Sequence, residues 1–443
     1  MLRTRAAVHL APIVAACAIV SPSFAQCGEG WVHGFGGSGV VPPDTVFAVE
    51  VLNDGDLIIG GDFDYAGGAL CNNIARYNPA TEMWSSLGTG VGGVPNARIN
   101  AIMELPGGDI LAGGEFTVAG GVPAQYLALW NGSTWSGFGQ VQGQPGVHGG
   151  VRALARMPDG TIIAGGNNHG ANDIPGGIQQ WDGLNWQPLG EGANRIVNAL
   201  AVLSDGRLLV GGDFSQAGGA PAGRVAIWDG ESWSTLGSAI PTSSGTIVYS
   251  LCPLPGGGAV IGGNFTTAGG VVASRIATWD GSVWSPMGAG FNSHVLALAR
   301  AANGQIVAGG SFTLSGATSA SFLAHWSGTS WSSLGGGTNS TVRAMTSAPA
   351  SDIVVAGSFS SAAGEPAPRI ARYTFGGPCC GSADFDGDGD IGTDADIEAF
   401  FACLAGNCCA TCFSGGADFN GDGDVGTDAD IEAFFRVLAG GAC

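Results

Sequence analysis

Residues 197–237 read VNALAVLSDGRLLVGGDFSQAGGAPAGRVAIWDGESWSTLG, and residues 248–288 read VYSLCPLPGGGAVIGGNFTTAGGVVASRIATWDGSVWSPMG. Related units begin near five further positions: Val46, Ile99, Val151, Val295 and Val342. The chain therefore carries seven repeats whose starts lie 46 to 53 residues apart. A period of this length is typical of propeller blades, each built from four strands. We therefore predict an all-β fold, a seven-bladed β-propeller.

Each repeat reads as four strands in the same order. A strand of alternating apolar and polar residues meets a turn such as Asp205-Gly206, and the second strand ends at paired glycines. Asp-Gly pairs allow the positive φ angles of tight hairpins, and paired glycines allow backbones to approach closely. A loop follows, then a third strand that ends in an aromatic residue and a fourth that opens with tryptophan.

These aromatic residues recur in register. The third strands end at Tyr77, Trp130, Trp181, Trp228, Trp279, Trp326 and Tyr373, and the fourth strands open at Trp84, Trp135, Trp186, Trp233, Trp284 and Trp331. Because large aromatic side chains bury much apolar surface, we interpret them as packing between blades and not as a binding site.

The seventh repeat lacks a fourth strand of its own. It ends in RIARYTFGGPCC, whereas GWVHGFGG around Trp31 is similar to a fourth strand. We predict that the N-terminal segment pairs with the strand holding Tyr373 and closes the ring, which removes free sheet edges. Cys27 would then lie near Cys379 or Cys380, where a disulfide could lock the closure.

One repeat indicates a family. It contains LIIGGDF and RYNPATEMW, with Gly60-Gly61, then Tyr77, then Trp84 after six intervening residues. This pattern resembles kelch repeats, and the shorter WDGESW turn of later repeats is similar to repeats of secreted bacterial propellers. The resemblance covers roughly residues 27–376. It implies a fold and leaves the function open, because one fold hosts many functions.

Composition and net charge indicate the fold class and the kinds of partner that the chain can bind. Glycine is present 80 times and only 11% of residues are charged, which favours short strands over helices. The net charge is −20, and 13 of the 35 acidic residues follow residue 376, against one arginine, Arg436. A chain this acidic repels phosphate backbones, so we expect no nucleic-acid partner. The acidic tail suggests a bound cation.

The N-terminus predicts export. Residues 1–25 read as a signal peptide, with Arg3 and Arg5, an apolar stretch, and a small-x-small cleavage site ending at Ala25. A lipoprotein cleavage box ending at Cys17 is the alternative. We expect no membrane span, and a secreted, extracellular or cell-surface protein with disulfides. Cys71 and Cys252 fall in non-neighbouring blades and are predicted to be free and buried. The predicted domains are a propeller over 26–376 and a calcium module over 377–443.

Two near-identical acidic loops make up that module. Residues 383–406 read ADFDGDGDIGTDADIEAFFACLAG and residues 417–440 read ADFNGDGDVGTDADIEAFFRVLAG. They follow the D-x-[DN]-x-[DN]-G rhythm of EF-hand loops, so we predict two calcium ions, with magnesium as the alternative. The predicted ligands are Asp384, Asp386, Asp388, Asp390 and Asp396 in the first loop, and Asp418, Asn420, Asp422, Asp424 and Asp430 in the second.

An amphipathic helix is predicted after each loop. Ile397, Phe400, Phe401 and Leu404 share one face of the first, and Ile431, Phe434, Phe435 and Leu438 repeat this in the second, so the two faces can pack together. The tandem resembles a dockerin, which implies a cohesin-like partner. Ala395 and Ala429 stand where that family places an acidic closing ligand, and Glu398, Glu432, Asp394 and Asp428 stay open as substitutes for Asp396 and Asp430. The resemblance implies partner contacts at Thr393, Asp394, Thr427 and Asp428.

The third repeat is irregular. It carries GGNNHGANDIPGG where others read GGDF…AGG, after a long connection, GQVQGQPGVHGG. Both segments should emerge on one ring face, and a drifted surface loop is the alternative to a ligand site. The candidate ligand-binding residues are His148, Asn168, His169, Asn172 and Asp173.

Three functions remain open. The first is a secreted calcium-binding scaffold whose propeller binds a glycan or protein while the dockerin-like tail tethers it to a cohesin-like protein or a cell-surface glycan. The second is a carbohydrate-active enzyme that acts at the propeller face, and the third is a surface structural protein. No nucleophile–base signature is present, so we name no catalytic residue. Carboxylates or histidines lining the central face would favour the enzyme, and an apolar or glycine-lined channel would favour binding.

Overall fold

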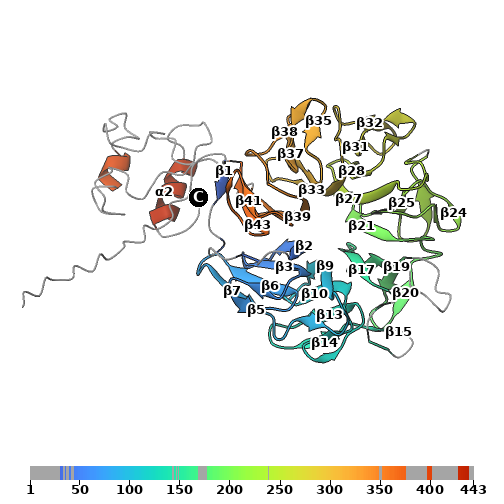
Figure 1. Ribbon diagram of the computed structural model, residues 1–443, viewed down its shortest axis with the longest axis horizontal. Coiled ribbons are helices and arrows are strands. Elements are labelled where there is room, and N and C mark those ends of the chain that lie inside the picture. Colours follow the sequence, from blue (N-terminus) through green and yellow to red (C-terminus); the bar gives the residue numbers. More distant parts are fainter. Residues whose placement is uncertain are drawn as a thin grey trace, which may run out of the picture.

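The computed structural model describes the repeats almost completely and the tail in part. The described residues are 30–32, 35, 39–40, 44–141, 144–145, 147, 149–167, 177–237, 239–348, 352–375, 397–401 and 428–438. Within them the chain is a β-propeller, with sheets arranged radially around a common centre (Figure 1).

Seven four-stranded antiparallel sheets are present among the described residues. We number these blades 1 to 7 in chain order and list the strands of each from the innermost to the outermost. Blade 1 contains β2 (Thr45–Val51), β3 (Leu57–Asp62), β6 (Ile74–Asn78) and β7 (Met83–Ser86). Blade 2 contains β9 (Arg98–Glu104), β10 (Ile110–Glu115), β13 (Leu127–Trp130) and β14 (Trp135–Gly137). Blade 3 contains β17 (Val151–Arg156), β18 (Ile162–Gly166), β19 (Ile178–Trp181) and β20 (Trp186–Pro188). Blade 4 contains β21 (Val197–Val202), β22 (Leu208–Gly212), β25 (Val225–Trp228) and β26 (Trp233–Thr235).

The remaining blades follow the same order. Blade 5 contains β27 (Ile247–Pro253), β28 (Ala259–Asn264), β31 (Ile276–Trp279) and β32 (Trp284–Pro286). Blade 6 contains β33 (Val295–Arg300), β34 (Ile306–Gly310), β37 (Leu323–Trp326) and β38 (Trp331–Ser333). Blade 7 contains β39 (Val342–Ser347), β40 (Ile353–Gly357), β43 (Ile370–Thr374) and β1 (Gly30–Val32). Each innermost strand contacts the innermost strands of both neighbouring blades, and β2 contacts β39 (Figure 1).

The outer strand of blade 7 comes from the other end of the chain. Trp31 lies opposite Tyr373 in the β1–β43 ladder, as the sequence predicts. Their rings meet edge to face with centroids 5.3 Å apart, and the Trp31 indole Nε1 donates to the Gly335 carbonyl of the preceding blade at 2.7 Å. Chain ends that are far apart in sequence thus share one sheet.

The loop between the second and third strands is more ordered than the sequence indicated. In six blades it folds into a hairpin of two-residue strands, because its Gly-Gly pair supplies two residues with positive φ in most copies. The hairpins are β4 (Tyr65–Ala66) with β5 (Ala69–Leu70), β11 (Val118–Ala119) with β12 (Val122–Pro123), β23 (Gln216–Ala217) with β24 (Ala220–Pro221), β29 (Thr267–Ala268) with β30 (Val271–Val272), β35 (Leu314–Ser315) with β36 (Thr318–Ser319), and β41 (Ser361–Ala362) with β42 (Glu365–Pro366). Two short pairings lie between blades: β8 (Val91–Gly92) joins β11, and β15 (Gln140–Val141) pairs with β16 (Gln144–Pro145).

The aromatic residues pack between blades, which confirms their interpretation. In blades 1 to 6, the fourth-strand tryptophan donates its indole N–H to a carbonyl oxygen nearer the N-terminus, as Trp135 does to Leu87 at 2.6 Å and Trp284 to Leu236 at 3.1 Å. Six loop phenylalanines are fully buried beside them: Phe63, Phe116, Phe214, Phe265, Phe312 and Phe359. Cys71 and Cys252 are free and buried, as predicted.

The described part of the tail is helical. Residues 397–401 are helical, and α2 spans Asp428–Leu438. Phe400 and Phe434 are fully buried and their rings stack with centroids 3.9 Å apart, so the predicted contact between the two apolar faces is present. No helix among the described residues is long and apolar enough to cross a membrane.

Candidate functional site

Every innermost strand contains a β-bulge near its N-terminal end. In blade 4, for example, Val197 pairs with Gly212 and Ala199 with Gly211, so Asn198 is left out of the ladder. Such bulges redirect one side chain and are frequent near functional sites. The seven bulge residues, which we call the collar, are Phe47, Asn100, Arg152, Asn198, Tyr249, Leu296 and Arg343.

The collar lies at one mouth of the central channel. Directly after each collar residue come two residues that line the channel, which has a volume of about 230 Å³. The first of each pair is alanine in six blades and Ser250 in blade 5, and the second is aliphatic or Met345. The lining residues are Ala48, Val49, Ala101, Ile102, Ala153, Leu154, Ala199, Leu200, Ser250, Leu251, Ala297, Leu298, Ala344 and Met345. The channel is therefore mostly apolar, with Ser250 as the polar residue of its lining, and six of the seven collar residues at its mouth, all but Leu296, are polar, charged or aromatic.

Several collar side chains reach the next blade. Asn100 Nδ2 donates to the Val151 carbonyl at 3.0 Å, and Asn198 Nδ2 donates to the Val248 carbonyl at 3.2 Å. Between them, an Arg152 Nη donates to Asn198 Oδ1 at 3.4 Å. These bonds join blades 2 to 5 at the mouth and hold Asn100, Arg152 and Asn198 in a defined arrangement.

Two arginines share one aromatic ring in this collar. The guanidinium carbons of Arg98 and Arg343 lie 5.7 and 5.2 Å from the centre of the Phe47 ring. A guanidinium over an aromatic face is stabilised by the ring quadrupole. Arg98 also forms an ion pair with Glu115 at 2.7 Å. Blades 7, 1 and 2 therefore meet in a compact basic and aromatic cluster.

Arg152 is half-buried at the mouth, whereas Arg343 is exposed. Burial lowers the pKa of Arg152, as does the charge of Arg98, against the opposing effect of Glu115. Burial likewise lowers the pKa of Arg343, with Asp62 opposing and Arg98 contributing. Because Arg98 influences both, the three guanidiniums form one electrostatic cluster.

The collar residue Tyr249 of blade 5 lies beside His294, which directly precedes blade 6. The Tyr249 and His294 rings lie 5.9 Å apart. Burial raises the pKa of the Tyr249 hydroxyl, and burial lowers the pKa of the His294 imidazole, which Arg275 lowers further. Both groups therefore favour their neutral forms at neutral pH and act as hydrogen-bonding groups there.

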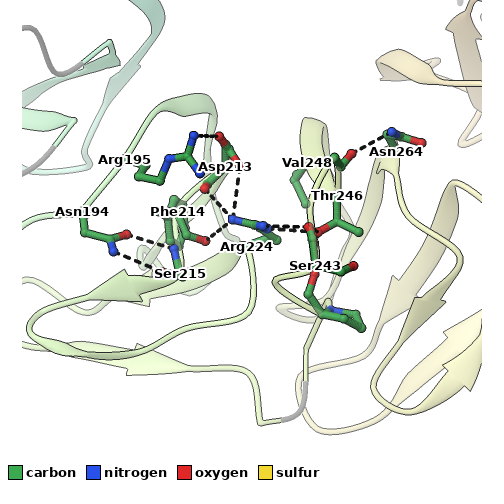
Figure 2. A network of polar contacts seen from close by, with 12 residues as sticks. Asn194, Arg195, Asp213, Phe214, Ser215, Arg224, Ser243, Thr246, Val248 and Asn264 are labelled. Atoms are coloured by element: carbon green, nitrogen blue, oxygen red, sulfur yellow. Dashed lines mark hydrogen bonds and ion pairs between the residues drawn. The ribbon is translucent and has the colours of Figure 1, made fainter.

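A buried arginine fixes the loops beside the collar (Figure 2). Arg224 adopts a φ of 60° and donates to the carbonyls of Asp213 and Phe214 on one side, and to Ser243 and Thr246 on the other. It also pairs with the Asp213 carboxylate at 3.1 Å. This network ties the blade 4 loop to the connection that enters blade 5, so we assign it a structural role.

The opposite mouth carries two glutamates. Burial, and then the charge of Glu104, raise the pKa of Glu50 to about 7. Glu104 accepts a hydrogen bond from the Asn53 backbone N–H at 2.8 Å. Among the described residues, no three histidine, cysteine or acidic side chains gather as a metal site.

The described flanks of the two segments that carry the sequence-predicted ligand residues lie beside the collar residue Arg152. His148, Asn168, His169, Asn172 and Asp173 lie outside the described residues, but the flanks of both segments meet, because the Asn167 N–H donates to the Gly150 carbonyl at 2.9 Å. Asn167 Oδ1 also accepts a 2.7 Å hydrogen bond from Arg152 Nε. The five predicted ligand residues thus stay a prediction, and the prediction did not include the collar.

The predicted calcium site lies almost wholly outside the described residues. Thr393, Asp394, Asp396 and Thr427 are not described, nor are the other predicted ligands, apart from the backbone of Asp428 and Asp430 in α2. The two calcium ions and the partner contacts thus stay predictions.

Sequence reasoning missed the collar although a signal was present. Six of the seven repeats begin with an apolar residue, a variable residue and then alanine, as in VFA, VRA and VNA. In six of the seven repeats the residue between these two positions is polar, charged or aromatic, which blade packing does not require. The variable position could therefore have been singled out, but its common placement at one mouth required the bulge.

Comparisons with known proteins agree on the propeller. A family described as the Rax2 C-terminal beta propeller domain matches residues 179–336, and a beta-propeller domain of unknown function (DUF5122) matches residues 52–80 and 352–374. No curated protein matches.

Solved structures give the same result. The extracellular domain of the putative one component system BT4673 from B. thetaiotaomicron is 13% identical over 80% of this chain and 42% of that chain, with a TM-score of 0.51. A second structure, of the extracellular domain of the putative hybrid two component system BT4673, is 14% identical over 82% and 42%, with a TM-score of 0.50. Virginiamycin B lyase from Staphylococcus aureus is 10% identical over 74% and 94%, with a TM-score of 0.47. This chain spans less than half the length of the first two, and the likeness to them shows the propeller fold.

Proposed function

We propose that the protein is an exported binding protein whose propeller holds a glycan or protein ligand at the collar. In this proposal seven kelch-like blades form a ring closed by the N-terminal strand, and a calcium-binding, dockerin-like tail tethers the ring to a cohesin-like protein or a cell-surface glycan. One observation carries the binding role: a collar in which six of seven side chains are polar, charged or aromatic surrounds a channel lined mostly by small and aliphatic residues.

The channel chemistry favours recognition over catalysis. Ligand sites combine apolar walls with a few polar groups that fix orientation, which describes the collar and channel. Hydrolysis of a glycoside instead needs two carboxylates facing the same bond. The channel walls beneath the collar are built from alanine, valine, leucine and isoleucine, with Ser250 and Met345.

Extracellular placement rests on the signal-peptide pattern of residues 1–25. The two BT4673 propellers, which are similar to this chain in fold, are extracellular domains. Calcium binding in the tail rests on the repeated acidic loops and on the stacking of Phe400 on Phe434, which brings the segments after both loops together. Oxygen donors at this spacing suit a hard divalent cation.

The binding role is tested on the mature protein, residues 26–443, with a glycan array and a pull-down of surface extracts, each with and without calcium. We expect a saturable ligand whose binding is lost in the Asn198→Ala/Tyr249→Ala variant and kept after deletion of residues 377–443. Attachment to partner proteins should instead be lost after deletion of residues 377–443 and kept in the Asn198→Ala/Tyr249→Ala variant. A ligand that ignores the collar variant would overturn the assignment of the site.

Calcium binding is tested by titration calorimetry. The mature protein should bind two calcium ions, and the Asp384→Ala/Asp418→Ala variant should lose both while the propeller keeps its thermal unfolding transition. Equal heats in the two proteins would contradict the proposal.

A second function is favoured by Glu50 and Glu104 at the opposite mouth. A carboxyl group with a pKa near 7 beside another carboxylate is the arrangement used by glycosidases for acid catalysis. If the protein is a carbohydrate-active enzyme, it should release reducing sugar from a polysaccharide. Glu50→Gln should abolish this release, and collar variants should leave it unchanged. Absence of release from every polysaccharide that the protein binds would eliminate it.

A further inference from the structure

Three arginines occupy one arc of the collar mouth. Arg343 comes from blade 7, Arg98 from blade 2 and Arg152 from blade 3, and Phe47 of blade 1 lies between the first two. The chain as a whole carries a net charge of −20, so this concentration of positive charge opposes the general trend.

The charges on this arc are only partly neutralised within the described residues. Arg98 has its partner in Glu115 at 2.7 Å, but neither Arg152 nor Arg343 has a described carboxylate within 4.0 Å. Both donate to neutral oxygens instead. Arg152 donates to the side-chain oxygens of Asn167 and Asn198, and Arg343 Nε donates to the Ser358 hydroxyl at 3.2 Å. A guanidinium has five N–H donors, so the contacts of the described residues leave donors on both side chains for a ligand.

Partial burial makes the unpaired charge of Arg152 costly without an anion. A buried charge is stable only when it is paired or well hydrogen-bonded, and burial lowers the pKa of the half-buried Arg152, whereas Arg343 is exposed and open to a ligand. Guanidiniums bind carboxylate and sulfate-like oxyanions through paired N–H···O bonds. An anionic ligand group at this mouth would supply the missing counter-charge.

The neighbouring side chains indicate what carries the anion. Amide and hydroxyl groups surround the arginines, including Asn100, Asn198, Ser358 and, further round the collar, Tyr249. Such groups match the hydroxyls of a sugar, whose rings also offer apolar faces to aromatic side chains. Arg343 and Arg152 stand in blades separated by two others, so a ligand that meets both must extend over more than one sugar unit.

We propose that the collar binds an anionic oligosaccharide, with Arg152 and Arg343 each receiving a carboxylate or sulfate group of a different sugar unit. This inference rests on the proposed binding function and names the ligand class for that same site. Arg98, paired with Glu115 and stacked on Phe47, positions the arc.

The test uses the mature protein and titration calorimetry with hexagalacturonate, a sulfated chondroitin hexasaccharide, cellohexaose and poly-glutamate. Arg152→Gln and Arg343→Gln should each weaken binding of the acidic saccharide at least ten-fold, since a charge-assisted hydrogen bond is lost in each. Arg343→Lys should recover part of the affinity. Arg300→Gln is the matched control, because Arg300 ends the innermost strand of blade 6 at the opposite mouth and its loss changes the net charge equally.

The outcomes separate the two proposals. Binding of cellohexaose but neither acidic saccharide would refute the anionic ligand and leave the binding function standing. Binding of no saccharide and no surface component would refute both. Equal binding of poly-glutamate would refute a saccharide site, and equal losses in Arg300→Gln and Arg152→Gln would show a general charge effect. If a collar variant fails to unfold cooperatively, competition of the wild-type complex by free galacturonate, with glucose as control, decides the same question.

Comparison of the carboxylated with the sulfated hexasaccharide identifies which acidic group is bound. Preference for either supports the inference, since both present oxyanions to the guanidiniums.

Discussion

Replacement of Trp31 by alanine tests whether the N-terminal strand is part of the structural core. Trp31 is 7% exposed, packs edge to face on Tyr373 and donates to the Gly335 carbonyl. Burial of roughly 150–250 Å² at about 25 cal/mol per Å² corresponds to about 4–6 kcal/mol. The hydrogen bond adds about 1 kcal/mol, while alanine retains part of the contact and the freed strand gains entropy. We therefore expect a loss of about 3–5 kcal/mol in unfolding free energy.

Urea denaturation followed by far-UV circular dichroism measures this loss, and Trp331→Ala serves as the matched control. Trp331 occupies the same fourth-strand position in blade 6 and donates to the Met287 carbonyl at 3.0 Å, but its strand continues directly from β37. Both variants should lose similar stability. Only Trp31→Ala should also release β1, so amide hydrogen exchange in β43 should accelerate there and stay slow in the control.

Two results would refute this reasoning. A loss below about 1 kcal/mol would mean that burial of Trp31 contributes little to global stability. Unchanged exchange of β43 in Trp31→Ala would mean that β1 stays paired without its tryptophan. The second result would separate the strand pairing from the aromatic contact.

Three further substitutions probe packing, charge and the loop network. Gly60→Ala should destabilise the propeller by about 1–3 kcal/mol in urea, since a Cβ there would meet Ile99 Cγ2 of the next blade at 2.5 Å; a neutral result would mean that the blades can separate. Burial, and then a neighbouring glutamate, raise the pKa of Glu50 from 4.5 to about 7, so stability present below pH 4.5 is lost as the pH rises through 7. Glu50→Gln should thus raise the unfolding free energy by at most about 3 kcal/mol at pH 8 and leave it unchanged at pH 4, and equal effects at both pH values would contradict this. Arg224→Ala should lower the unfolding free energy by about 3–5 kcal/mol, because the Arg224 side chain is 4% exposed and donates to several carbonyls. Arg207→Ala, which removes an exposed ion pair, should lower it by less than about 1 kcal/mol in the same assay. Similar losses in the two variants would argue against the network.

The repeat period, the strand order and the pairing of Trp31 with Tyr373 were accessible from the sequence. Alternation, turn residues and aromatic positions are local features that recur in every blade, so each copy supports the interpretation of the others. The burial of the tryptophans followed from the same repetition. The calcium loops are also a local pattern, and they stay a prediction because their ligands lie outside the described residues.

The collar required the tertiary structure. A bulge shifts one residue of each innermost strand out of its ladder, and the ring then gathers seven such residues from positions as far apart as Phe47 and Arg343. The same closure brings two guanidiniums over one phenylalanine ring and a second glutamate close to Glu50. The period of the repeat determines which residues of a blade face the neighbouring blade. Which side chains of different blades come close together, and how far they are removed from water, depends on the closed ring of sheets. These two factors decide the chemistry of the mouth.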